Sequence, residues 1–406
     1  MDIVEQESNR NFKAFIWHAA FLALASNFMD VDTIIPAMLL NVGGNAIHMG
    51  ILTTIMIGGA SLMQLLFSGI LSNQGFKKKF LISAINLRVL SLLSLSALFY
   101  YENVLSKSFV FTAIFILITI FSFSGSFANV SYVDILGKTI RAEKRKRFFS
   151  LKQLITSVGL LSSAFAAGWV LKSYIFPINY SYLYLLAGLL LLTASIGFYF
   201  LSEKNPSSLK KIRFKQFFIQ MPKEISNNSN LKNYLLIINL LGIGVSLLPF
   251  VILLAKESQG ITFTLIGTFL IFRTLGMLIG SLSLFFMSKK FQYKNVLLLS
   301  ALLGASIPIL ALIIQHHSYL FPGIFMLSGI FVSIFKISMN GMLVDISTNE
   351  NRTLYTGMAG AGNLLPTIFP LLAGVLIQFI GYYWVFSLIS LSMLFSVLFI
   401  KKLNCK

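Results

Sequence analysis

The feature that most restricts the fold of this chain is a series of long apolar runs. Twelve of them approach the roughly 20 residues that a helix needs to cross the hydrocarbon core of a membrane. These runs, which we number spans 1 to 12, cover residues 15–41, 49–72, 80–101, 108–133, 151–171, 180–201, 234–254, 263–287, 296–314, 319–342, 355–379 and 383–400. Each is continuously apolar and longer than the alternating strands of about 10 residues that build a membrane barrel. The sequence therefore predicts an all-α membrane protein with twelve transmembrane helices.

Composition and charge agree with a membrane location. Hydrophobic residues make up 56% of the chain and charged residues 11%, whereas a soluble domain carries about a quarter charged residues. Of the 32 Lys and Arg residues, 26 lie in the termini and in the even-numbered connections, if Lys152 at the edge of span 5 is counted with the connection before it, and only three lie in the odd-numbered ones. This distribution predicts cytoplasmic termini in a plasma membrane, the inner membrane of a bacterium. The net charge of +19 would then face anionic lipid, so no nucleic-acid partner is expected.

A repeated motif divides the chain into two related halves. Asn129-x-x-x-Val-Asp134-Ile recurs as Asn340-x-x-x-Val-Asp345-Ile, and both copies are followed by a basic stretch and a helix rich in small residues. An internal copy about half the chain length away indicates a duplicated structural unit. We expect a six-helix bundle over residues 1–202, a basic cytoplasmic linker over 203–232 and a second six-helix bundle over 233–406.

The connection between spans 2 and 3 carries a short motif. Its matching residues are Gly69, Leu71, Ser72, Lys77 and Lys78. With twelve spans in two halves and a basic connection between spans 6 and 7, this pattern resembles the major facilitator superfamily (MFS), although Asn73 and Gln74 replace the acid and the base of the signature. The resemblance implies two pseudo-symmetric bundles, secondary active transport by alternating access, and a cavity lined by spans 1, 4, 7 and 10.

The first span of each half carries residues that weaken a helix. Span 1 contains Asp30, Asp32 and Pro36, and its counterpart, span 7, contains Gly242, Gly244 and Pro249. Pro36 cannot donate a hydrogen bond to the carbonyl of Asp32, four residues earlier. Discontinuous helices at matching positions of two halves indicate the central site of a transporter.

Two carboxylates inside span 1 are candidates for proton coupling. Asp32 is favoured over Asp30 because Asp32-x-x-x-Pro36 resembles an arrangement in span 1 of proton-coupled drug exporters of this superfamily. Such a carboxylate would take up a proton on one side of the membrane and release it on the other. The alternatives are that one Asp pairs with a buried Arg as a packing contact, or that it lies near enough to the surface to be wetted.

Basic and amide side chains inside the spans are candidate substrate ligands. The resemblance places Arg273 and Lys336 where they could receive an anionic group, and the candidate amide ligands are Asn27, Asn129 and Asn340. Other uses remain open: Arg273 could pair with an Asp of span 1, Lys336 could extend to the inner surface or pair with Asp345, and the amides could join helices. Arg88, in span 3, is expected to be structural.

The inner ends of spans 4 and 10 carry acidic residues followed by arginines. In the family that the chain resembles, such pairs close the inner gate, which here would use Asp134 with Arg147 and Asp345 with Arg352. The alternative is exposed charge pairs worth less than about 1 kcal/mol each.

Motifs for other functions are missing from the sequence. It contains no phosphate-binding Gly-x-x-x-x-Gly-Lys-Ser/Thr loop and no nucleophile and base pattern, so neither an ATPase nor another enzyme is expected, and no cofactor. Cys405 is the only cysteine, which argues against a disulfide or metal framework.

These observations predict a monomeric, proton-coupled secondary transporter of a small anionic or zwitterionic organic solute. The alternatives are a proton antiporter that exports lipophilic cations and, in another class, a sensor or scaffold that transports nothing.

Overall fold

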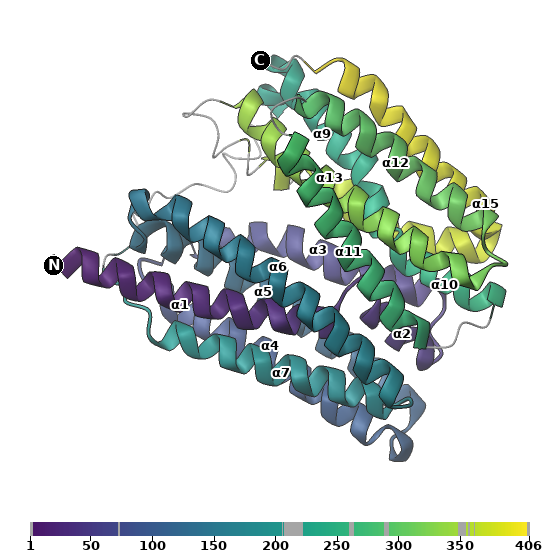
Figure 1. The fold of residues 1–406 in the computed structure, drawn as a ribbon, viewed down its shortest axis with the longest axis horizontal. Coiled ribbons are helices and arrows are strands. Elements are labelled where there is room, and N and C mark those ends of the chain that lie inside the picture. Colours follow the sequence, from purple (N-terminus) through teal and green to yellow (C-terminus); the bar gives the residue numbers. More distant parts are fainter. Residues whose placement is uncertain are drawn as a thin grey trace. The chain divides into compact units, whose positions relative to one another are not determined.

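The computed structural model describes residues 3–71, 74–204, 206, 222–259, 264–287, 292–347, 355, 358–360 and 362–403. All the regular secondary structure in these ranges is helical, as Figure 1 shows. The all-α membrane fold predicted from the apolar runs is therefore confirmed.

The helices of the first half follow the predicted spans. They are α1 (Ile3–Ser26), the 3-10 turn η1 (Asn27–Met29), α2 (Ile34–Asn41), α3 (Ala46–Leu71), α4 (Lys78–Tyr100), η2 (Glu102–Val104), α5 (Lys107–Thr139), α6 (Ala142–Ser173) and α7 (Ile178–Tyr199). The second half contains α9 (Ser229–Gly242), η3 (Ile243–Ser246), α10 (Leu248–Gln259), α11 (Thr264–Met287), α12 (Tyr293–Ile313), η4 (Ser318–Leu320), α13 (Phe321–Ile346) and α15 (Leu364–Lys401).

The number of membrane crossings is consistent with twelve. Ten segments of the described chain are long and apolar enough to span a membrane, and α3, of 26 residues, is a further apolar helix. The long α15 joins two predicted spans across Gly381, whose φ of 81° and ψ of 172° are not helical. A backbone conformation with positive φ costs glycine little, because it has no Cβ. The boundary predicted between residues 379 and 383 therefore coincides with a real break in the helix.

The predicted interruptions of the two first spans are also present. Span 1 divides into α1, η1 and α2, and span 7 divides into α9, η3 and α10. In span 1, the residue after η1 is extended, and Val31–Thr33 form a turn before α2 begins. Proline and the acidic side chains account for this break, because neither favours a continuous helix inside a membrane.

The helices pack into two compact units. Unit 1 contains Met1–Asp30 and Leu62–Arg213, and unit 2 contains Val31–Ser61 and Phe214–Lys406. The ranges expected from the sequence follow chain order and assign residues 31–61 to the first bundle, whereas these residues pack with the later helices. The boundary between the units falls at the break in span 1.

Unit 1 is built around α4 and α1. Helix α4 packs on α5 and α7, and α1 packs on α6 and α7. Phe15, fully buried, contacts the rings of Tyr132, Phe148 and Phe198 in edge-to-face geometry. Such ring pairs contribute about 0.5–1.5 kcal/mol beyond the burial of area. This aromatic cluster holds α1, α5, α6 and α7 together.

Unit 2 relies on close approach of helix backbones. Gly276 and Gly280 of α11 face the carbonyl oxygens of Met326 and Ile330 of α13, and a Cβ at either glycine would be in steric conflict with α13. Small residues at four-residue spacing allow such tight packing in membranes. The α11 and α13 pair is the most extensive helix contact of the unit.

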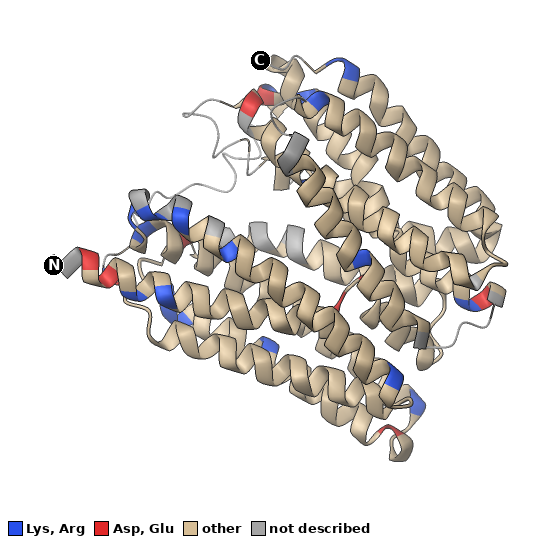
Figure 2. Ribbon diagram, viewed as in Figure 1, with Lys and Arg blue, Asp and Glu red and all other residues tan. Residues whose placement is uncertain are grey.

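The charged residues are placed as a bilayer requires. In Figure 2 they lie mainly at the ends of helices and in connections, while the middle portions of the helices are largely uncharged. Large apolar side chains such as Trp169, Phe379 and Trp384 are exposed in the absence of lipid. The few charges that lie within spans therefore identify the sites that need a chemical explanation.

Candidate functional site

An ion pair lies at the break in span 1, inside unit 2. The carboxylate of Asp32, in the turn before α2, accepts a hydrogen bond from the guanidinium of Arg273 on α11. Only 13% of the Asp32 side chain and 8% of the Arg273 side chain are exposed. Helix α2 packs against α10 and α11, which brings the two residues together.

In this structure Arg273 forms one of the contacts that the sequence left open. The sequence allowed it either to receive an anionic substrate or to pair with an Asp of span 1, and the structure contains the pair. Asp30, two residues earlier in the same bend, ends η1 in an extended conformation and belongs to unit 1. Removing one partner from a buried ion pair costs about 3–5 kcal/mol, because the other charge is then left without compensation. Asp32 and Arg273 therefore depend on each other.

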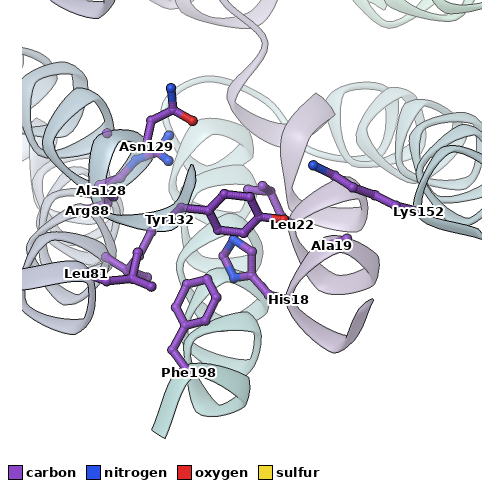
Figure 3. A pocket seen from close by; sticks show the side chains of 12 residues that line it. His18, Ala19, Leu22, Leu81, Arg88, Ala128, Asn129, Tyr132, Lys152 and Phe198 are labelled. Atoms are coloured by element: carbon purple, nitrogen blue, oxygen red, sulfur yellow. The ribbon is translucent and has the colours of Figure 1, made fainter. Parts of the chain in front are cut away.

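A second polar site lies in unit 1, where residues of helices α1, α4, α5, α6 and α7 line an open pocket of about 140 Å³ (Figure 3). Its lining consists of His18, Ala19, Leu22, Leu81, Ile85, Arg88, Gly125, Ala128, Asn129, Tyr132, Lys152 and Phe198. Two lining residues, Arg88 and Lys152, are basic, and no carboxylate belongs to this set. The pocket is therefore positively charged.

Arg88 was not recognised as a site residue from the sequence. Its guanidinium carbon lies 4.3 Å from the centroid of the Phe121 ring, and its Nε is buried with no hydrogen-bond partner in the described chain. The side chain as a whole is half-buried, and a charged side chain within a span costs roughly 3 kcal/mol or more to insert. The structural role expected for Arg88 stays a prediction; the structure adds that Arg88 lines a pocket.

Tyr132, Lys152 and His18 complete the polar part of this pocket. The hydroxyl of Tyr132 is buried without a partner in the described chain, and the ammonium of Lys152 lies 5.2 Å from the centroid of the Tyr132 ring. His18 lies 3.3 Å, through Nδ1, from the carbonyl oxygen of Ala194. In Figure 3, Lys152 and Arg88 extend toward Tyr132 from different sides.

The three predicted amide ligands have different environments. Asn27 is buried, and its Nδ2 donates to the carbonyl of Leu160 at 2.5 Å and to Ser163 Oγ at 3.1 Å, so it connects η1 to α6. Asn129 lines the pocket of unit 1. Asn340 is exposed on α13. Of the three, only Asn129 is placed at a described pocket.

Lys336, the remaining predicted substrate ligand, is also exposed on α13. It belongs to unit 2, as does Arg273, and Asn340 follows it by one helical turn.

One of the predicted inner-gate residues, Asp134, belongs to a network of charges in unit 1. Asp134 pairs with Lys77 at 2.7 Å and with Lys138 at 3.2 Å, and Lys138 also pairs with Glu203 at 2.7 Å. Glu203 accepts from the backbone N–H groups of Lys77 and Lys78, at the start of α4. Sequence reasoning missed Glu203, although a carboxylate near a helix N-terminus is favoured electrostatically.

Of the other predicted gate residues, two lie in the described part of the chain. Arg147 and Asp345 are exposed, and Arg352 lies outside the described residues. The ion pairs described for Asp134 are with lysines of the 2-3 connection and of its own helix. Among the described residues, no group of three or more His, Cys, Asp or Glu side chains is placed to hold a metal ion.

Apolar helices that cross a membrane, broken first spans and ionisable side chains within the spans define a membrane transport protein. The chain belongs to the Major Facilitator Superfamily, whose sequence model matches residues 16–248 and 234–403. It is therefore an integral membrane protein and a transporter of a small-molecule substrate. Comparison with curated protein sequences gives no significant match.

Solved structures share the fold at low sequence identity. A point mutant of the nucleoside transporter NupG superposes with a TM-score of 0.70 at 13% identity, covering 97% of this chain and 99% of that chain. A bacterial homologue of the iron transporter ferroportin, in an inward-facing state, gives 0.69 at 13% identity, covering 97% and 98%. The xylose transporter XylE from E. coli gives 0.66 at 13% identity, covering 96% and 95%. At this identity the likeness concerns the fold alone.

Proposed function

We propose that this protein is a proton-coupled secondary transporter of a small organic solute with an anionic or zwitterionic group, working by alternating access. The observation that carries the proposal is the buried ion pair between Asp32 and Arg273 at the break in span 1. Neither charge would be stable alone in that environment. Binding of a proton to Asp32, or of an anion to Arg273, therefore changes the stability of the other charge strongly.

The pair couples proton binding to anion binding through competition. While Asp32 is ionised, it occupies the guanidinium of Arg273. Protonation of Asp32 removes the negative charge, and Arg273 then presents a planar fork of N–H donors that suits a carboxylate or phosphate. A solute anion that binds Arg273 likewise favours a protonated Asp32. Proton and anion therefore bind together, and the gradient sets the direction of net movement.

The remaining predicted residues have supporting roles in this proposal. Lys336 and Asn340, one helical turn apart on α13, are proposed as further substrate ligands, together with Asn129 of unit 1 and the buried amide of Asn27. Asp134, Arg147, Asp345 and Arg352 are proposed to act at the inner gate. We also propose a monomer in a plasma membrane with both termini in the cytoplasm, which is supported by the distribution of Lys and Arg.

The test is solute-driven proton movement in liposomes that contain the purified protein and a trapped pH-sensitive dye. The probes are a panel of small mono- and dicarboxylates and phosphate monoesters, with tetraphenylphosphonium as a lipophilic cation. We expect at least one anion to drive proton entry with the wild-type protein and none to do so with Asp32→Asn. Asp30→Asn, in the same bend, is the matched comparison and should keep coupling.

Two results would contradict the proposal. If Asp32→Asn kept full coupling and Asp30→Asn lost it, the ion pair would not be the coupling element. If tetraphenylphosphonium drove proton movement and no anion did, the protein would be an exporter of lipophilic cations instead.

A further inference from the structure

The pocket of unit 1 contains polar groups that the packing of the described chain leaves without partners. The Nε of Arg88 and the hydroxyl of Tyr132 are both buried without a hydrogen bond, and the ammonium of Lys152 contacts the face of the Tyr132 ring. We propose that this pocket binds an oxyanion group, a carboxylate or a phosphate, through Arg88 and Lys152. The proposed coupling uses Asp32 and Arg273 of unit 2, whereas this pocket lies in unit 1. Binding of an oxyanion there is therefore a separate property from proton coupling.

The orientation of Arg88 supports this assignment. One face of the guanidinium lies over the Phe121 ring, which leaves the N–H groups at the edge of the plane to find acceptors. Gly125 makes the position possible, because a Cβ there would lie 3.3 Å from both Cζ and Nε of Arg88. Stacking on Phe121 gives the buried Nε no acceptor, so an acceptor bound in the pocket would satisfy it.

The charges around the pocket indicate which ligand completes it. Arg88 and Lys152 contribute two positive charges, and the lining residues include no carboxylate. Tyr132 adds a hydroxyl and Asn129 an amide to the lining of the same pocket (Figure 3). Buried charges in proteins are paired. A negatively charged group with several acceptor oxygens would satisfy all of these donors.

The volume limits what can enter. Pockets that hold a whole drug-sized ligand usually measure about 300–1,000 Å³, whereas this one measures about 140 Å³. It therefore accommodates the charged head of a ligand rather than an extended molecule. That head can come from a free solute or from the phosphate of a lipid, and the chemistry of recognition is the same for both.

The experiment measures ligand-induced thermal stabilisation of the purified full-length protein in a non-ionic detergent. The probes are inorganic phosphate, acetate and glycerol phosphate, compared with chloride at the same ionic strength. We expect the melting temperature of the wild type to rise in a saturable way with at least one probe. Arg88→Met should abolish this rise and Lys152→Met should weaken the apparent affinity at least tenfold, while Lys172→Met, an exposed lysine of the same helix α6, should behave as the wild type.

Arg88→Lys separates binding from a structural role. Lysine keeps the positive charge but loses the planar guanidinium, so we expect binding to be weakened and not abolished. If Arg88→Met does not fold, Arg88→Lys and Lys152→Met together test the proposal. Equal stabilisation of the wild type and the Arg88 and Lys152 variants would overturn the proposal, as would the lack of stabilisation of the wild type by every probe in both detergent and nanodiscs.

Nanodiscs distinguish the two sources of the anion. The same titration is made in discs of phosphatidylcholine alone and in discs that also contain phosphatidylglycerol. If the anionic lipid raises the melting temperature of the wild type but not of Arg88→Met, and suppresses the effect of phosphate, the occupant is a lipid head group. If the effect of phosphate is the same in both discs, the site takes a free solute.

Discussion

Arg273 in unit 2 and Arg88 in unit 1 are both arginines held within membrane spans, but they are stabilised in opposite ways. Arg273 has a carboxylate partner, Asp32, from another helix. Arg88 has an aromatic ring beneath it, a pocket beside it and a buried Nε without an acceptor in the described chain. A buried Nε without an acceptor is common to both arginines, so the difference lies in the counter-charge: Asp32 supplies one to Arg273, whereas the pocket beside Arg88 is lined by no carboxylate.

The difference shows that charged residues within spans can serve different functions. A paired charge responds to protonation of its partner, so it suits coupling. An unpaired charge beside a pocket suits binding of a ligand with the opposite sign. The predictions below test whether this contrast is reflected in stability.

The largest effect is expected when the paired arginine is removed. Arg273→Met should destabilise the protein by about 3–5 kcal/mol, because Asp32 would remain buried without its partner. Thermal unfolding in detergent measures the loss. The double variant Asp32→Asn with Arg273→Met should recover most of it, since an uncharged pair needs no compensation. A double variant that is as unstable as the sum of both single variants would show that the two residues act independently.

An intermediate effect is expected at the charge network of unit 1. Glu203→Gln should cost about 2 kcal/mol, because the carboxylate, only 3% exposed, accepts from two backbone N–H groups and pairs with Lys138. The same unfolding assay applies. The control is Glu7→Gln. Glu7 Oε2 lies 4.0 Å from Lys204 Nζ, and the lysine side chain is largely exposed. This substitution should therefore change stability by less than about 0.5 kcal/mol. Equal losses in the two variants would show that the network adds nothing beyond surface charge.

The smallest effect is expected when the unpaired arginine is removed. Arg88→Met, measured without phosphate or carboxylate in the buffer, should stay within about 1 kcal/mol of the wild type or be more stable, because a half-buried charge in a pocket lined by no carboxylate is replaced by an apolar side chain of similar length. A loss as large as that of Arg273→Met would remove the contrast and indicate a structural role for Arg88.

Much of the fold could be predicted because it follows from local chemistry. Long apolar runs require helices in a membrane, and Pro36, Gly242 and Gly381 interrupt them where the structure has its breaks. The partner of Arg273 could be stated only as an alternative. Helix periodicity places Asp30 and Asp32 on different faces, but it does not show which face meets α11.

The pocket of unit 1 was harder to foresee because its residues come from five helices. One local signal was available: Gly125, Asn129 and Tyr132 recur at four- and three-residue spacing, which places a gap and two polar groups on one face of α5. Lys152 was counted with the basic connection before span 5, although it lies within α6 and reaches Tyr132. Which helices surround that face depends on tertiary packing and not on the sequence near Tyr132.

The position of the unit boundary within span 1 affects how this protein can be recombined with its relatives. The long connection joins the two sequence repeats, so it is the obvious junction for an exchange of halves between two proteins. Such a hybrid would inherit Arg273 from one parent and Asp32 from the other, because residues 31–61 pack with the later helices. Hybrids of this kind would therefore remain functional only when both parents carry the matching acid and base, so compatibility between parents depends on two positions far from the junction.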